Sequence, residues 1–169
     1  MELKKTVNLA NFLALATVLN IVESFIPIFS NFVPGIKLGL TNIVIILVLY
    51  SYSFKEALIV SILRVFLVGI LRTGLFSISF FFSLGGAFLS IFMMYIVKKF
   101  TKLSMVGVSV VGSFFHSIGQ VIVAIIILKN INMIYYLPWI LLFSIPTGCL
   151  IGIVSKEIYI HLQKILKNK

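Results

Sequence analysis

Long apolar segments dominate the sequence and limit what the chain can fold into. The hydrocarbon core of a bilayer, about 30 Å thick, needs roughly 20 apolar residues of helix to cross it. The chain has 169 residues, of which 61% are hydrophobic and 11% are charged. The segments of suitable length are approximately residues 7–29, 40–53, 54–71, 76–97, 103–128 and 134–158. We therefore expect a single all-α membrane domain with six transmembrane helices.

The second of these segments is short for a complete span. As a helix, residues 40–53 would cover only about 21 Å, at 1.5 Å per residue. We expect the preceding loop, residues 30–39, to enter the protein at membrane depth. Irregular backbone is tolerated there only where it is buried or lines a cavity. The Pro34-Gly35 pair in this loop is a turn signal.

The basic residues predict how the chain is oriented. If the N-terminus is inside, ten basic residues lie on the cytoplasmic side and three on the other, which follows the positive-inside rule. The formal net charge of +10 is then explained by topology, and nucleic-acid binding is not expected. We expect both termini to be cytoplasmic. The ten are Lys4, Lys5, Lys55, Lys98, Lys99, Lys102, Lys156, Lys164, Lys167 and Lys169; the three are Lys37, Arg72 and Lys129.

Three polar residues interrupt the first apolar segment. Such side chains are costly at membrane depth and face the bundle interior or a water-filled cavity. Asn20 and Glu23 are three residues apart and share a helix face. Asn11, nearer the inner end, is equally well explained as an amide that bridges helices. Glu23 either faces a substrate or forms a salt bridge, for which Arg72 is one partner.

The third segment carries two arginines and a glutamate. Glu56 lies near the inner surface, Arg64 near the middle and Arg72 at the outer end. Arg64 stays charged, so it needs a carboxylate, carbonyl groups or an anionic ligand as partner. Arg64 and Arg72 are eight positions apart, so on a regular helix they project about 80° apart and could line one broad cavity. Arg64 either binds a ligand or forms a buried ion pair. For Arg72, contact with lipid headgroups is the alternative to lining the cavity.

The fifth segment contains the run GSFFHSIGQ. Gly112, His116 and Gln120 follow i, i+4, i+8 spacing and form one stripe. Small residues allow a neighbouring helix to approach, and polar side chains can then bond across. His116 and Gln120 either bridge helices in this way or contact a ligand. In the sixth segment, Gly148 and Gly152 have the G-x-x-x-G spacing of close helix packing.

Several kinds of chemistry are excluded by what the sequence lacks. It contains no aspartate, no P-loop, no G-x-S-x-G and no H-E-x-x-H. His116 has no second histidine or aspartate within range, so a metal site is not expected. We expect no catalytic residue and no cofactor. Any driving energy must come from a partner.

An ordered set of motifs resembles a known membrane family. The motifs are LGLTNI, FKEALIVSILR, RTG, SLGG, GVSVVGSFFHSIGQ and YYLPWILLFSIPTG, and they extend from about residue 10 to 152. The chain resembles the family labelled both Gx transporter and heptaprenyl diphosphate synthase component I. That family is similar to the S components of energy-coupling factor (ECF) transporters of bacterial cytoplasmic membranes.

The S-component resemblance implies a fold, partners and a site. It implies six helices with both termini inside and an outer ligand cavity that the first loop covers. Ala10 and Ala14 would meet a transmembrane coupling subunit, which works with ATPase subunits. The ligand-facing candidates are Asn20, Glu23, Asn42, Arg64, Arg72, His116 and Gln120.

Three functions remain to be compared. The leading interpretation is a substrate-binding subunit that captures a small anionic or aromatic, vitamin- or flavin-like molecule for uptake. The second is a membrane anchor or accessory subunit of a redox or quinone-related complex. The third is an accessory of heptaprenyl diphosphate synthase. The chain cannot be the catalytic synthase subunit, because prenyl elongation uses aspartate-rich motifs to hold Mg²⁺.

Overall fold

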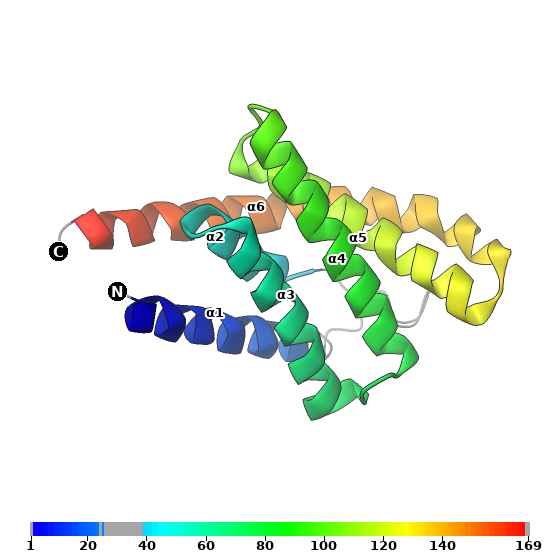
Figure 1. Ribbon diagram of the computed structural model, residues 1–169. Coiled ribbons are helices and arrows are strands. Elements are labelled where there is room, and N and C mark those ends of the chain that lie inside the picture. Colours follow the sequence, from blue (N-terminus) through cyan, green and yellow to red (C-terminus); the bar gives the residue numbers. More distant parts are fainter. Residues whose placement is uncertain (1, 24, 26–38, 168–169) are drawn as a thin grey trace.

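The computed structural model describes residues 2–23, 25 and 39–167, and all regular structure within them is helical (Figure 1). Residues 26–29 of the first predicted span and 30–38 of the predicted loop lie outside these ranges. The elements are α1 (Glu2–Glu23), α2 (Asn42–Ser51), α3 (Phe54–Val68), the π-helical turn η1 (Gly69–Thr73), α4 (Ile78–Phe100), α5 (Met105–Leu128), the 3-10 helix η2 (Ile131–Tyr136) and α6 (Leu137–Lys167).

Helix length and apolar character identify a membrane protein. Four helices in the described part are long and apolar enough to cross a membrane: α1, α4, α5, and α6 together with η2. α4 and α5 match their predicted spans to within about three residues, whereas α1 begins five residues earlier than predicted and α6 ends nine residues later. α2 has only 10 residues, as the short second segment predicted, and α3 has 15. Large apolar side chains are exposed on every long helix, which is typical of a lipid-facing surface.

The short helix α2 forms the centre of the bundle. Every residue from Val44 to Leu49 is buried, so the helix is apolar and enclosed all round. Its neighbours are α1, α3, α5 and α6. The core around it includes Ile91, Val108 and Ile151. Because α2 begins at Asn42 inside this core, its N-terminal end is enclosed by protein.

Helices α4, α5 and α6 pack with unusually close backbones. A methyl group added to Gly119 of α5 would lie only 2.5 Å from the carbonyl oxygen of Gly85 in α4. On the other side of α5, a methyl group on Gly148 of α6 would lie 2.8 Å from the Val110 Cα atom. The G-x-x-x-G prediction for α6 is therefore confirmed as internal packing. Two serines bond across the same contacts: Ser90 Oγ donates to Gly112 O at 2.8 Å, and Ser109 Oγ donates to Gly148 O at 2.7 Å.

One end of the bundle gathers basic side chains and both ends of the described chain. The first turn of α1 and the last turns of α6 lie on the same side of the molecule (Figure 1). Lys98 of α4 donates to the carbonyl oxygen of Leu49 at 2.7 Å and so satisfies the last turn of α2. Tyr50 of α2 meets Tyr159 of α6 edge to face, with ring centres 6.0 Å apart. We refer to this side as the basic end.

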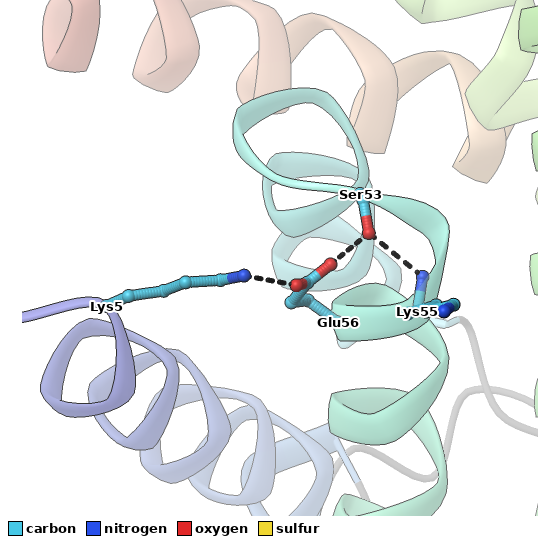
Figure 2. Close-up of polar contacts among 4 residues, drawn as sticks. All are labelled: Lys5, Ser53, Lys55 and Glu56. Carbon is cyan, nitrogen blue, oxygen red and sulfur yellow. Dashed lines mark hydrogen bonds and ion pairs between the residues drawn. The ribbon is translucent and has the colours of Figure 1, made fainter. Parts of the chain in front are cut away.

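A polar network at the basic end joins α1 to α3. Lys5 pairs with Glu56, and Ser53 donates a hydrogen bond to the same carboxylate (Figure 2). Ser53 also caps α3 by accepting from the backbone N–H of Lys55 at 3.2 Å. This charged first turn precedes the apolar part of α3, which begins at Ala57. The hydrogen bonds from Lys5 and then Ser53 lower the pKa of the Glu56 carboxyl to about 2.

Candidate functional site

A buried polar cluster lies where α1, α2 and α3 meet. We define the arginine cluster as Glu23, Gly39, Thr41, Asn42 and Arg64. Glu23 is the last residue of α1, Gly39 to Asn42 lead into α2, and Arg64 lies in the second half of α3. All five residues are buried. The structure thus brings together three of the predicted ligand-facing residues, from three different helices.

Glu23 connects the members of the arginine cluster. Its carboxylate Oε1 accepts a hydrogen bond from the backbone N–H of Gly39. The same carboxylate interacts electrostatically with the guanidinium of Arg64. Two partially compensated charges are thereby held inside the protein, where an isolated charge would be very costly. Asn20, one turn earlier in α1, is also buried on this side of the helix.

The turn before α2 positions these groups closely. Gly39 has a positive φ of 87°, a conformation that favours glycine. A methyl group added there would lie 3.1 Å from the side-chain nitrogen of Asn42. The backbone N–H groups of Asn42 and Ile43 bond back to the carbonyl oxygens of Gly39 and Leu40. α2 therefore starts with a tight turn, and its positive dipole end points into the cluster.

Several donors in the arginine cluster remain unused. The Oγ1 atom of Thr41, the Nδ2 atom of Asn42 and the Nε atom of Arg64 are buried, and they make no hydrogen bond with the residues that the structure describes. Thr41 stands in the N-cap position of α2 without a side-chain capping bond. Unpaired buried polar atoms are rare and call for an explanation. Here they indicate a site that can accept a polar ligand.

The predicted stripe on α5 faces α4. A methyl group added to Gly86 would lie 2.9 Å from both the ring Cε1 and the carbonyl oxygen of His116, and 3.0 Å from the Gln120 side chain. His116 and Gln120 therefore pack against the one glycine that leaves room for them. The two amide atoms of Gln120 are buried and make no hydrogen bond with the described residues. These two residues form a second polar group, at the contact of α5 with α4, whereas the arginine cluster lies on α1, α2 and α3.

A small cavity adjoins Gln120. It measures about 20 Å³, which is room for roughly one water molecule. Apart from Gln120 its walls are mainly apolar, and Tyr136 of η2 and Ile140 of α6 close one side. A vitamin-sized ligand needs some 300 Å³ or more. In this conformation the cavity can therefore hold a solvent molecule but not such a ligand.

Arg72 differs from Arg64 in its exposure. It is exposed at the end of η1, with its guanidinium 4.6 Å from the centre of the Phe25 ring. The prediction that Arg64 and Arg72 line one cavity assumed a regular α-helix between them. The π-helical turn of η1 changes the direction in which Arg72 projects, because i→i+5 bonding widens the helix. Arg64 is buried, whereas Arg72 is exposed.

The two alanines of the first helix lie on its outer face. Ala10 and Ala14 are both exposed, in line with Val7 and Val18. Asn11, beside them, is exposed as well, and no hydrogen bond joins it to another helix in the described part of the chain. The opposite face of α1 buries Ala16 against the α2 core. The outer face is therefore smooth, and a second helix could approach it closely.

Three residues of the site were not singled out from the sequence. Gly39, Thr41 and Gly86 shape the two polar groups, although the motifs LGLTNI and SLGG contain them. The signal that could have identified Thr41 is its place directly before a continuous apolar run, which is typical of an N-cap. Among the described residues, no group of three or more histidine, cysteine, aspartate or glutamate side chains could hold a metal ion. The side chains of the arginine cluster are of the kinds that bind polar groups.

Comparison with protein-family models gives a match over most of the chain. A family model described as heptaprenyl diphosphate synthase component I matches residues 12–158. The chain belongs to this family. The match includes the arginine cluster and the α5 stripe, while Ala10 precedes it. Neither the curated proteins nor the solved structures give a match.

Proposed function

We propose that this member of the component I family is a substrate-binding membrane subunit of the ECF type. It captures a small molecule and passes it inward with a coupling subunit and ATPase subunits. The observation that carries the proposal is the arginine cluster. It places a guanidinium, a carboxylate and unused donors at the enclosed end of a short helix, as transporters that bind solutes at membrane depth do. This role is non-catalytic.

In the proposed topology the protein lies in the plasma membrane and has six membrane segments. Both termini are in the cytoplasm. α2 and the apolar part of α3 supply the two segments that are too short to span as isolated helices. Support comes from the basic end, where Lys5, Lys55, Lys98 and Lys99 gather near the same end of the bundle. Cytoplasmic loops carry such an excess of lysine and arginine.

The proposed partner surface is the outer face of α1. Ala10 and Ala14 let a transmembrane helix of the coupling subunit approach the α1 backbone. Tryptophan at both positions would fill this space. We expect Ala10→Trp with Ala14→Trp to lower both coupling-subunit recovery and uptake by about tenfold or more, equivalent to about 1.4 kcal/mol or more.

The test is co-purification of the tagged chain from native membranes, together with uptake by intact cells. Ile126→Trp is a matched control, because Ile126 is equally lipid-exposed but lies on α5, which does not pack on α1. It should leave recovery and uptake unchanged. The proposal is wrong if no coupling subunit is recovered with the wild-type chain and the double variant takes up solutes normally.

The family description favours a second candidate function. Its wording names a component of heptaprenyl diphosphate synthase, so the chain could be a membrane accessory of a separate catalytic subunit. This candidate predicts that adding the purified chain in lipid vesicles changes the activity of a soluble prenyl synthase. The transporter proposal predicts no change in that assay.

A further inference from the structure

We propose that the Glu23 carboxylate occupies an anion site that receives the carboxylate of the ligand, so that the molecule captured is a small organic acid. The inference deepens the proposed function and rests on it, because it names the class of the transported molecule. Its basis is the arrangement of charge and donors around Glu23. The internal carboxylate shows which kind of group this part of the protein accommodates.

Three positive features converge on the Glu23 carboxylate. The guanidinium of Arg64 attracts it, and Arg64 keeps its charge at any physiological pH. The backbone N–H of Gly39 donates to it. The N-terminal end of α2 adds the positive end of a helix dipole, which favours anions. Because α2 starts inside the core, this dipole end is shielded from water and acts at low dielectric.

The arginine cluster also contains polar atoms that have no hydrogen-bond partner among the described residues. Thr41, Asn42 and Arg64 are 1%, 2% and 3% exposed, and each has a buried polar atom without a hydrogen-bond partner among the described residues. Asn42 Nδ2 and Arg64 Nε can only donate, whereas the Thr41 hydroxyl can donate or accept. A ligand with a carboxylate and a neighbouring polar group would supply the missing acceptors. The side chain of Glu23, fixed to α1, supplies only its own two oxygens.

The balance of charge favours a carboxylate over a phosphate. When the Glu23 carboxylate is displaced, one permanent cation remains, and a ligand carboxylate neutralises it with a single negative charge. A planar carboxylate also fits the paired N–H groups of a guanidinium. A phosphate dianion would leave a surplus negative charge in the buried site, which is costly. In this proposal the Glu23 side chain rotates away from Arg64 and the Gly39 N–H group and so releases the site to a ligand carboxylate.

Chemical rescue by acetate tests the anion site directly. Glu23→Ala removes the internal carboxylate and leaves Arg64 uncompensated, so the variant should melt at a lower temperature than the wild type. Sodium acetate should restore the melting temperature in a saturable manner. The expected rise is about 3–6 °C at an acetate concentration ten times its dissociation constant. The wild-type chain, in which the tethered Glu23 carboxylate competes with acetate for the same donors, should show a much smaller rise.

Matched probes and variants complete the acetate experiment. Acetamide has the shape of acetate without the charge and should give no rise at equal concentration and ionic strength. Arg64→Met combined with Glu23→Ala should abolish the response to acetate. Glu23→Asp shortens the side chain by one methylene group and retains the charge. It can be measured in place of Glu23→Ala if that variant does not fold. We expect a smaller acetate response from it than from Glu23→Ala, but a larger one than from the wild type.

The outcomes separate this inference from the proposed function. Equal responses to acetate and acetamide, or rescue by inorganic phosphate alone, would overturn the assignment of a carboxylate site. The acetate assay needs no coupling subunit. A positive acetate response without uptake or a coupling partner would support the anion site and remove the transporter proposal. Intact uptake with no acetate response would support the transporter proposal and remove the anion site.

Discussion

The two halves of the bundle are held together by different interactions. In α4–α6, glycines bring the helix backbones into direct contact, and serine hydroxyls bond to carbonyl oxygens across those contacts. In α1–α3, α1 is joined at one end by Lys5 with Glu56 and at the other by Glu23 with Gly39 and Arg64. Shape therefore determines the packing of one half, while charge determines much of the other. The half that depends on charge contains the candidate binding site.

This difference bears on how the two halves can change. Backbone contacts between helices have little freedom, because any shift produces overlap or a void. Charged pairs can be exchanged for another partner of the same charge without rebuilding the core. We infer that α4–α6 form the stable frame and that ligand-dependent change is concentrated in α1–α3. The predictions below test this contrast, beginning with the largest effect.

The largest expected effect follows from Arg64. Arg64→Met leaves the Glu23 carboxylate buried without its cation, which should lower the free energy of unfolding by about 3–5 kcal/mol. Adding Glu23→Gln to this variant removes the orphaned charge and should recover most of the loss. Thermal or denaturant unfolding of the purified protein in detergent measures both. A small loss that the second substitution does not reduce would show that charge does not hold α1–α3 together.

An intermediate effect is expected in the glycine contacts. Gly119→Ala places a methyl group 2.5 Å from the carbonyl oxygen of Gly85 and should cost about 1–3 kcal/mol of stability. Gly107→Ala is the control, since the added methyl group would meet only the Leu103 side chain, at 3.3 Å. We expect the control to change stability by less than about 1 kcal/mol. Equal losses in the two variants would mean that the close α4–α5 contact is not what stabilises this half.

The smallest effect concerns the basic end. The pKa of Glu56 is lowered from 4.5 to about 2, so its pairing with Lys5 stabilises the fold above pH 4.5 and is lost as the pH falls towards 2. Lys5 is 47% exposed, so the contribution is screened by solvent and should not exceed about 0.5 kcal/mol. Lys5→Met should therefore melt slightly below the wild type at pH 7. The difference in melting temperature between Lys5→Met and the wild type should shrink as the pH is lowered from 4.5 towards 2. The difference between Lys4→Met and the wild type should stay constant over the same range.

The helices could be predicted well from the sequence, because bilayer thickness sets their length. The bounds of α4 and α5 agree with their predicted segments to within about three residues. The short α2 followed from counting the apolar residues between two turn signals. The turn η1 could not be predicted, because no residue between Arg64 and Arg72 distinguishes π from α hydrogen bonding. The direction in which Arg72 projects could therefore not be predicted from helix periodicity.

The candidate site was only partly accessible from the sequence. The cost of a charge at membrane depth identified Glu23 and Arg64 one by one and required a partner for each. Which helices bring such partners together depends on tertiary packing, so the interaction of Glu23 with Arg64 was not predicted. The spacing of His116 and Gln120 correctly predicted that they lie on one face of α5. Its contact with Gly86 depends on how α4 and α5 cross, which spacing along α5 does not determine.

Native mass spectrometry of the protein released from its own membrane tests the central claim most directly. The account predicts that the wild-type chain retains a small organic acid and that Arg64→Met loses it. Ile126→Trp, altered on the lipid-facing side of α5, should retain the same molecule. Recovery of lipid adducts alone, identical in the wild type and Arg64→Met, would contradict a substrate-binding role for the arginine cluster.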